Sequence, residues 1–236
     1  MRGRHKPGKR QDHYFRKAKA EKYLARSVYK IQEIDARFRI LKPGQVVLDL
    51  GAAPGSWVQY AAHKVAPGGR VIALDRKPLA GPLPHGVTAL QADLLEVVAA
   101  GLPGVLGIDR VDVLLSDMAP STSGHKEVDH FRSMALCRAA FEAAEQVLQP
   151  GGAWVCKAFQ GVDLEPFVRD IRGRFGRFKR VKPKSSRKES VEIFLVGTGF
   201  HGGGGARSHP GDAEATTLSS EENQDDGQGH DANGPQ

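Results

Sequence analysis

Residues 46–57 read VVLDLGAAPGSW, an apolar run that reaches an acidic residue and then a turn of small residues and proline. A second run of this kind, VLLSDMAP, occupies residues 113–120. Each run has the length and composition of a buried strand that ends at a tight turn. Ligands bind at the carboxyl ends of strands in open α/β sheets. The two strand ends therefore predict one cleft, with a nucleotide-like cofactor on one side and the chemistry on the other.

Strand-like and helix-like segments alternate along the middle of the chain. The expected strands cover residues 46–50, 70–74, 87–90, 111–116, 153–157, 175–181 and 191–196. Helical patterns cover about residues 12–38, 55–65, 94–100, 128–148 and 163–173. This alternation predicts an α/β fold, with a seven-stranded and mostly parallel sheet between helices on both faces. Because no helix separates the last two strands, they are expected to form an antiparallel hairpin at the edge of the sheet.

Composition divides the chain into three parts. Residues 1–11 form a basic arm that is expected to be flexible, and residues 12–200 form one domain that opens with a basic helix. Residues 201–236 contain seven acidic residues, one Arg and a single large apolar side chain, Leu218. Such a tail cannot bury enough surface to offset its ordering entropy, so it is predicted to be disordered.

Positive charge is concentrated at both ends of the predicted domain. Because the whole chain carries +7 and the tail −6, residues 1–200 carry +13. Residues 1–42 hold 14 Lys and Arg against 4 Asp and Glu, and residues 157–200 hold 11 against 5. Two basic segments flank a cofactor-type core. This arrangement favours binding to a nucleic acid, rather than solubility alone, as the reason for the positive charge.

The cysteines and the N-terminal segment give information about the cellular compartment of the protein. Cys137 and Cys156 are the only cysteines, and their wide spacing argues against a disulfide framework or a zinc site. No other metal-ligand cluster is visible, so no metal is expected. The start of the chain lacks the apolar stretch of a signal peptide, and no run approaches the length of a membrane span. A cytoplasmic monomer with no membrane partner is the expectation.

The loop at residues 51–55, GAAPG, predicts the kind of cofactor. It has neither the G-x-G-x-x-G of a dinucleotide site nor the Gly-Lys-Ser/Thr of a phosphate loop, which leaves S-adenosylmethionine, a cofactor without phosphates. Asp75 and Asp93 end the next two strands, where they can meet the ribose hydroxyls and the adenine edge. The alternative for each carboxylate is a helix cap or a turn. Trp57 is expected to contact the cofactor, with core packing as its alternative.

Lys157 ends the otherwise apolar strand at residues 153–157. An unpaired buried ammonium group is costly, so Lys157 requires a partner or a chemical task. Asp117 ends the strand that is expected to lie beside it, and the pair is either structural or catalytic. Lys30, on the basic helix, and Glu192, in the last strand, are further candidates that spacing alone cannot bring together.

These motifs resemble those of the FtsJ-type ribosomal RNA 2′-O-ribose methyltransferases, the RlmE family. The likeness spans about residues 12–199 and rests on RSVYK at 26–30, DLGAAPG at 49–55, SDMAP at 116–120, VCKAFQG at 155–161 and KPKSSR at 182–187. It implies the Rossmann-like fold of S-adenosylmethionine-dependent methyltransferases. It also implies a catalytic Lys-Asp-Lys-Glu tetrad, which falls on Lys30, Asp117, Lys157 and Glu192. The family's cofactor contacts fall on Gly51, Gly55, Trp57, Asp75, Asp93 and Asp117.

Two positions depart from the family pattern. Ser56 stands where the family usually has a second glycine, and Glu189 lies close enough to Glu192 to compete for the glutamate position. The choice of Glu192 depends on an alignment without gaps from residues 186–187.

The resemblance implies in-line methyl transfer from S-adenosylmethionine to a ribose 2′-hydroxyl in large-subunit ribosomal RNA. A uridine within the assembled subunit is the expected target. Lys157 would be the general base, Lys30 would orient the hydroxyl, and Glu192 would hold a lysine or the ribose. The same tetrad also serves tRNA-ribose and mRNA-cap methyltransferases. The alternatives are therefore a tRNA ribose methyltransferase and, from another class, a non-catalytic RNA-binding factor for ribosome assembly.

Overall fold

The computed structural model describes residues 9–187 and 189–202, with only the backbone described for residues 9–12. The flexible arm was predicted for residues 1–11 and the disordered tail for residues 201–236, and residues 1–8 and 203–236 lie outside this description. The prediction is wrong for residues 9–11, which begin helix α1 (Lys9–Ala20), and the N–H of His201 donates to the carbonyl of Arg174 at 2.9 Å. Across the described ranges, no helix combines the length and the apolar character that crossing a membrane requires.

Seven strands form one sheet in the order β3-β2-β1-β4-β5-β7-β6. The strands are β1 (Val46–Leu50), β2 (Arg70–Asp75), β3 (Val87–Gln91), β4 (Val111–Ser116), β5 (Leu148–Phe159), β6 (Phe175–Val181) and β7 (Glu192–Phe200). Strands β1 to β5 pair in parallel, whereas β7 runs antiparallel to both β5 and β6. The predicted α/β class and the antiparallel C-terminal hairpin are confirmed, and β7 is the strand that joins this hairpin to the parallel sheet.

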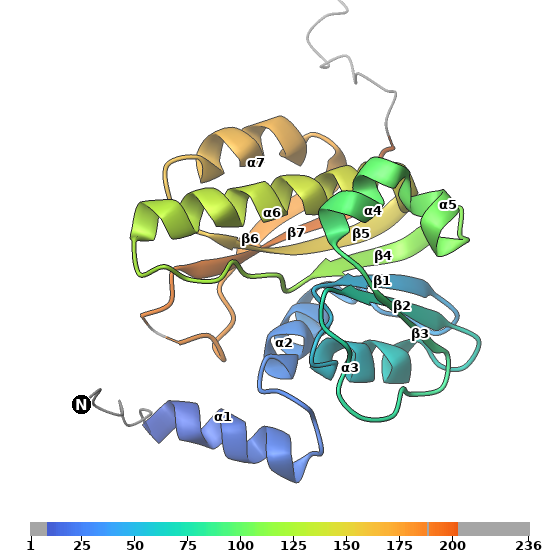
Figure 1. Cartoon of the computed structure of the whole chain (residues 1–236), viewed down its shortest axis with the longest axis horizontal. Coiled ribbons are helices and arrows are strands. Elements are labelled where there is room, and N and C mark those ends of the chain that lie inside the picture. The colour runs from blue at the N-terminus through green and yellow to red at the C-terminus, as the bar shows by residue number, and fades with distance from the viewer. Residues whose placement is uncertain (1–8, 188, 203–236) are drawn as a thin grey trace, which may run out of the picture. The chain divides into compact units, whose positions relative to one another are not determined.

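Helices cover both faces of the sheet (Figure 1). They are α1 (Lys9–Ala20), α2 (Val28–Phe38), α3 (Ser56–Val65), α4 (Leu94–Ala100), α5 (Leu102–Leu106), α6 (Lys126–Val147) and α7 (Leu164–Arg172). Helices α4 to α7 pack on one face, and α1 to α3 pack on the other, so two hydrophobic cores flank the sheet. Side chains alternate along β1 between these cores: Leu48 and Leu50 belong to the first, and Val47 to the second.

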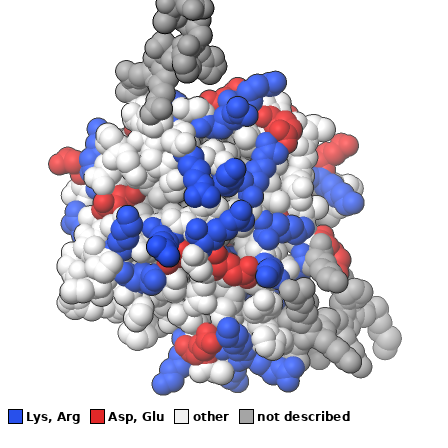
Figure 2. Space-filling view, turned by 180° about the vertical axis from the view of Figure 1, so that it is seen from behind, with Lys and Arg blue, Asp and Glu red and all other residues white. Residues whose placement is uncertain are grey.

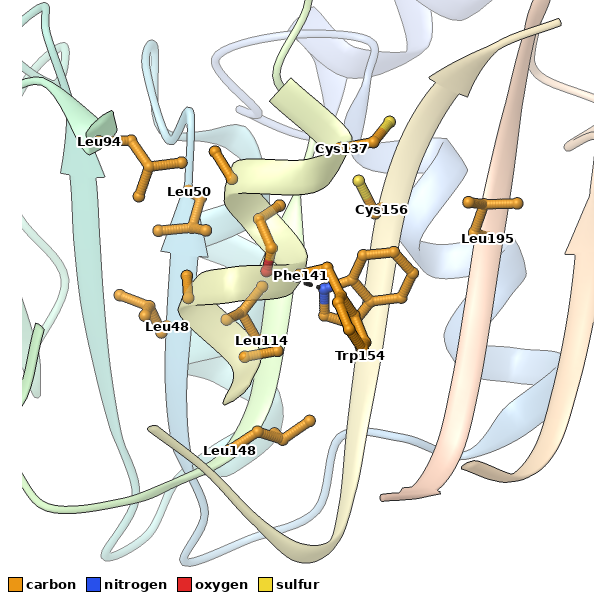
Figure 3. Close-up of a cluster of buried hydrophobic side chains, with 14 of the residues drawn as sticks. Leu48, Leu50, Leu94, Leu114, Cys137, Phe141, Leu148, Trp154, Cys156 and Leu195 are labelled. Atoms are coloured by element: carbon orange, nitrogen blue, oxygen red, sulfur yellow. Dashed lines mark hydrogen bonds between the residues drawn. The ribbon is translucent and has the colours of Figure 1, made fainter. Parts of the chain in front are cut away.

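Trp154 of β5 organises the core beneath α6 (Figure 3). Its indole N–H donates to the carbonyl of Ala140 at 3.1 Å, which satisfies the one polar atom of a fully buried ring. The ring meets Phe141 edge to face and stacks on Phe175 of β6. Cys137 and Cys156 are free and buried in the same core. This packing fixes α6 across β5, the strand that carries Lys157.

The prediction of one helix over residues 12–38 is wrong. Helix α1 ends at Ala20, and α2 begins only at Val28. Lys22 adopts a left-handed backbone conformation with φ of 60°, and the N–H of Tyr23 closes the end of α1 on the carbonyl of Ala18. The break lets α1 fold back so that the rings of Tyr14 and Tyr29 lie 5.3 Å apart. Tertiary packing thus overrides a helical pattern that was continuous in the sequence.

The other differences lie near element ends. Helix α5 was not expected, and β5 begins at Leu148, within the helix predicted for 128–148. Because β5 starts early, Leu148 pairs with Val111 of β4. The register between the two strands then shifts before Val113. Strand β7 extends to Phe200, four residues beyond its predicted end at 196.

Core packing predicts a large difference between two leucines. Leu114 of β4 is fully buried, so Leu114→Ala should lower the free energy of unfolding by about 2–5 kcal/mol through lost burial and an unfilled cavity. Leu95 of α4 is 58% exposed, so Leu95→Ala should change it by no more than about 0.5 kcal/mol. Urea denaturation of both variants measures the two values, and similar losses would contradict the packing described here.

Candidate active site

The carboxyl ends of β1, β2, β4 and β5 meet at one edge of the sheet because these strands run parallel. Ser116 of β4 lies opposite Cys156 of β5, so the residues that follow each of them are neighbours. Lys157 Nζ donates to the backbone oxygen of Asp117 at 2.5 Å and contacts its carboxylate Oδ1 at 3.0 Å. The side chain of Lys157 is only 8% exposed. The structure thus gives this buried ammonium group the partner that the sequence required.

The second pair joins residues that are far apart in the sequence. Lys30 on α2 contacts the carboxylate of Glu192 at 2.6 Å, and both side chains are largely buried. Glu192 is the first residue of β7 and pairs with Phe159, two residues beyond Lys157 on β5. Glu189 is exposed. Glu192, which the sequence alignment favoured over Glu189, is the glutamate that contacts Lys30.

The two pairs act on one another electrostatically. Burial by itself would raise the pKa of the Glu192 carboxyl. The charge of Lys30, its 2.6 Å contact with the carboxylate, and the charge of Lys157 outweigh burial, so the pKa of Glu192 lies below its ordinary value. Glu192 is therefore an ionised carboxylate that faces both lysines.

The glycine loop turns beside these groups. Gly51 has φ of 74°, and a Cβ atom there would lie 2.4 Å from the side chain of Met118, so only glycine fits. Asp75 braces the loop, because its carboxylate accepts the N–H of Ala53 at 2.9 Å and that of Lys77 at 2.8 Å. Gly55 has φ of 117° and precedes α3, whose amino terminus faces the same edge.

Asp49, near the end of β1, is a functional candidate that sequence reasoning did not single out. Its side chain is fully buried, and neither carboxylate oxygen has a hydrogen-bond partner among the described residues. Burial, followed by the charges of Asp117 and Asp75, raises its pKa well above the ordinary value. The available signal was an acidic residue inside an apolar strand. An unpartnered buried carboxyl that is acted on by two other acids marks this end of β1 as a strongly acidic site.

Asp93 and Trp57 have structural roles in addition to the cofactor contacts predicted for them. Asp93 caps α4 by accepting the N–H of Leu95 at 2.9 Å, which is the alternative that its position in the sequence allowed. Trp57 is buried, donates its indole N–H to the carbonyl of Ser27 at 2.9 Å, and packs 5.8 Å from the ring of Phe194. Their contacts with a cofactor stay predictions.

Ser56, the departure from the glycine pattern, joins the glycine loop to α2. Its hydroxyl lies 2.9 Å from that of Ser27, the N-cap residue of α2. Together with the bond from Trp57 to Ser27, this contact ties the first turn of α3 to the start of the helix that carries Lys30. The loop and one lysine of the site are therefore held in a fixed relation.

A family model described as FtsJ-like methyltransferase matches residues 23–200. The chain belongs to the FtsJ-like methyltransferase family. The match includes the glycine loop, both ion pairs and the C-terminal hairpin, so the candidate site lies within the family domain.

Relatives of this FtsJ-like chain are similar over nearly their whole length. The protein named ribosomal RNA large subunit methyltransferase E from Desulfosudis oleivorans is 49% identical over 189 residues, which cover 80% of this chain and 90% of that protein. A protein of the same name from Oleidesulfovibrio alaskensis is 50% identical over 194 residues, covering 82% and 94%. A crystal structure described as that of a ribosomal RNA methyltransferase from Plasmodium falciparum matches with a TM-score of 0.67 and 29% identity. That match covers 76% of this chain and all of the solved chain.

The state of Asp49 predicts a pH-dependent effect on stability in this FtsJ-like domain. Because its pKa is raised in the folded protein, folding retains a proton that the unfolded chain releases above about pH 4. The contribution of Asp49 to stability therefore declines as the pH rises from about 4 towards 7. Asp49→Asn cannot ionise, so its free energy of unfolding relative to the wild type should increase over that range, as measured by denaturation at several pH values.

Asp109→Asn is the matched control, because Asp109 is exposed on the loop before β4. Its stability difference from the wild type should stay constant with pH. A constant difference for Asp49→Asn as well would mean that Asp49 is ionised in the folded protein.

Proposed function

We propose that this chain transfers the methyl group of S-adenosylmethionine to the 2′-hydroxyl of a uridine ribose in large-subunit ribosomal RNA. The observation that carries the proposal is the meeting of the Lys157–Asp117 and Lys30–Glu192 pairs at the edge of the sheet, beside the glycine loop. Methyl transfer to a hydroxyl requires one group to accept a proton and others to align the two reactants. The four side chains supply both kinds of group.

The residues around the loop fit S-adenosylmethionine. This cofactor is a cation at its sulfur and has ribose hydroxyls that donate hydrogen bonds, and the charges of Asp75 and Asp117 are close enough here to raise the pKa of Asp49. A pocket of about 290 Å³ opens beside Asp75, lined in part by Leu79 and Gln91, with room for the nucleoside part. In this proposal Asp75 holds the ribose, Asp93 lies at the adenine edge, and the glycine loop admits the cofactor close to the backbone. When bound, S-adenosylmethionine would supply an already activated methyl group.

Lys157 is the proposed general base. A ribose hydroxyl becomes a good nucleophile only as its proton leaves, so an acceptor must lie within hydrogen-bond reach of it. The two contacts with Asp117 fix the position of Lys157 Nζ at the strand end. Lys30 is held by ionised Glu192, so these two residues are proposed to orient the ribose and not to remove its proton.

Ribosomal RNA is the proposed substrate because the similar bacterial proteins are named for it and because the charge of this chain suits RNA. Residues 1–200 carry +13, and Figure 2 shows Lys and Arg side chains spread over one face, with fewer Asp and Glu among them. Contacts with phosphates position a nucleic acid without reading its sequence. We propose that the chain acts as a monomer on the assembled large subunit.

Replacing the proposed base tests the mechanism. Lys157→Arg keeps a positive charge but cannot release a proton, so it should lose about as much activity as Lys157→Ala, on the order of 10²–10⁴-fold. Single-turnover methylation with saturating S-adenosylmethionine measures the loss, and calorimetry checks that the cofactor still binds. Retention of most of the rate by Lys157→Arg would make Lys157 a positioning cation.

Lys64→Arg is the matched control for this substitution. Lys64 on α3 also forms an ion pair, with Asp35 at 3.4 Å, but it lies on a helix face outside the site. The variant should methylate at the wild-type rate. A comparable loss in Lys64→Arg would indicate that the exchange of lysine for arginine acts through the fold.

Three RNA substrates separate the proposed function from its alternatives. Undermethylated large subunits, protein-free large-subunit RNA and tRNA are each offered with radiolabelled S-adenosylmethionine. We expect methyl transfer to the particles to exceed transfer to protein-free RNA, with the label at a uridine 2′-oxygen. Transfer to tRNA alone would support a tRNA methyltransferase. Absence of transfer to all three, with RNA still bound, would support the non-catalytic assembly factor.

A further inference from the structure

Strand β5 runs beyond its parallel neighbour at the candidate site. Strand β4 ends at Ser116, which lies opposite Cys156, whereas β5 continues to Phe159. The backbone groups that β5 presents on its β4 side past this point need other partners, because an N–H or C=O that is shielded from water without one is costly. On the other side of β5 lies β7, where Glu192 is opposite Phe159.

Three buried side chains of α6 supply these partners. The N–H of Phe159 donates to the Ser133 hydroxyl at 3.0 Å, and its carbonyl accepts a hydrogen bond from His130 Nδ1 at 3.1 Å. One turn further along α6, the Cys137 thiol donates to the carbonyl of Lys157 at 3.3 Å. Spacings of three and four residues place the three side chains on one face of the helix. Helix α6 thus takes over from β4 along the last residues of β5.

His130 also binds the loop that follows β5. Its Nε2 accepts the backbone N–H of Asp163 at 3.2 Å, and the Asp163 carboxylate lies 3.3 Å from the same nitrogen. A neutral ring accepts the N–H, and a charged ring would donate to the carboxylate, so Nδ1 carries the proton that it donates to Phe159 in both states. A Cβ atom on Gly161 would collide with the imidazole, so the loop packs directly against the ring.

The bonds to Phe159 bear on the reacting groups because Phe159 lies between two of them. Lys157 is two residues earlier on β5, and Glu192 is opposite on β7. A shift of the end of β5 would therefore displace both the proposed base and the carboxylate that contacts Lys30, relative to the glycine loop between β1 and α3. Misplacement by about 1 Å can cost on the order of 10²-fold in rate.

We propose that His130 and Ser133 are positioning residues for methyl transfer, and that their bonds to Phe159 align Lys157 and Glu192 with the ribose and the cofactor. The inference rests on the function proposed above and adds to it two residues that act through the backbone of β5. Because they do not act on a reactant directly, losing either bond should slow the chemical step and leave the binding of cofactor and RNA unchanged.

Two substitutions at His130 separate its two bonds. The amide of His130→Asn reaches the position of Nδ1 and can donate to Phe159, whereas the longer amide of His130→Gln reaches the position of Nε2 and can bind only Asp163. We expect His130→Asn to keep most of the wild-type rate, and His130→Gln to lose about 10- to 100-fold. Ser133→Ala removes the acceptor of the Phe159 N–H and should lose a similar factor.

Single-turnover methylation of undermethylated large subunits, with both the particles and S-adenosylmethionine saturating, measures the rate of the chemical step. Calorimetry measures the Kd of S-adenosylmethionine, and filter binding measures the Kd of the particles. Both Kd values should equal those of the wild type in all three variants. A contact that served only the fold would not divide its effects between rate and binding in this way, nor between Asn and Gln.

Gln146→Ala is the matched control for lost stability. Gln146 lies at the other end of α6 and also bonds to two backbone groups, accepting the N–H of Leu102 at 2.9 Å and donating to the carbonyl of Val98 at 3.0 Å. Because both bonds are lost, the variant should lower the free energy of unfolding in urea at least as much as His130→Gln does. It should nevertheless methylate at the wild-type rate.

Several results would overturn the positioning role while leaving the proposed function intact. These are wild-type rates in both His130→Gln and Ser133→Ala, equal losses in the Asn and Gln variants, weaker binding in place of a slower step, and a comparable loss of rate in Gln146→Ala. A wild type that methylates none of the three RNA substrates would refute the proposed function, and this inference with it.

Discussion

A buried ammonium group must have a partner, and this constraint links the sheet of the protein to its chemistry. Lys157 emerges from a strand that is otherwise apolar and buried, and Asp117 receives it through both its backbone oxygen and its carboxylate. Removing either partner would leave an uncompensated charge in a low-dielectric environment. The contact requires β4 and β5 to lie in the observed register, so the pairing of these strands determines the position of the proposed base.

The antiparallel hairpin completes the site from the other end of the chain. Because β7 lies between β5 and β6, Glu192 starts its strand opposite Phe159, close to the end of β5. An edge position for β7 would carry Glu192 a full strand away from Lys157. Lys30 arrives from α2 on the face opposite α6, so the ion pair between Lys30 and Glu192 also joins that helix layer to the sheet.

Carboxyls around the glycine loop share one edge of the sheet but differ in state because their surroundings differ. Glu192 faces two ammonium groups, and its pKa is lowered, whereas Asp49 faces carboxylates inside an apolar strand, and its pKa is raised. The carboxylate of Asp75 accepts hydrogen bonds from the backbone N–H groups of Ala53 and Lys77. The acids at this edge therefore have three different roles. Glu192 is a fixed anion, Asp75 braces the glycine loop, and Asp49 is a protonatable group near the end of β1.

The sequence by itself determined the alternation of strands and helices, the glycine loop and the need of Lys157 for a partner, because these follow from local composition and from the cost of burying charge. It missed the break between α1 and α2, where the contact of Tyr14 with Tyr29 overrides a continuous helical pattern. It did not identify Asp49, whose importance comes from the acids around it and not from its neighbours in the chain. The alignment favoured Glu192 over Glu189, but only the tertiary structure brought Lys30 to it, because contacts across more than 150 residues depend on strand order and helix packing, which no local pattern encodes.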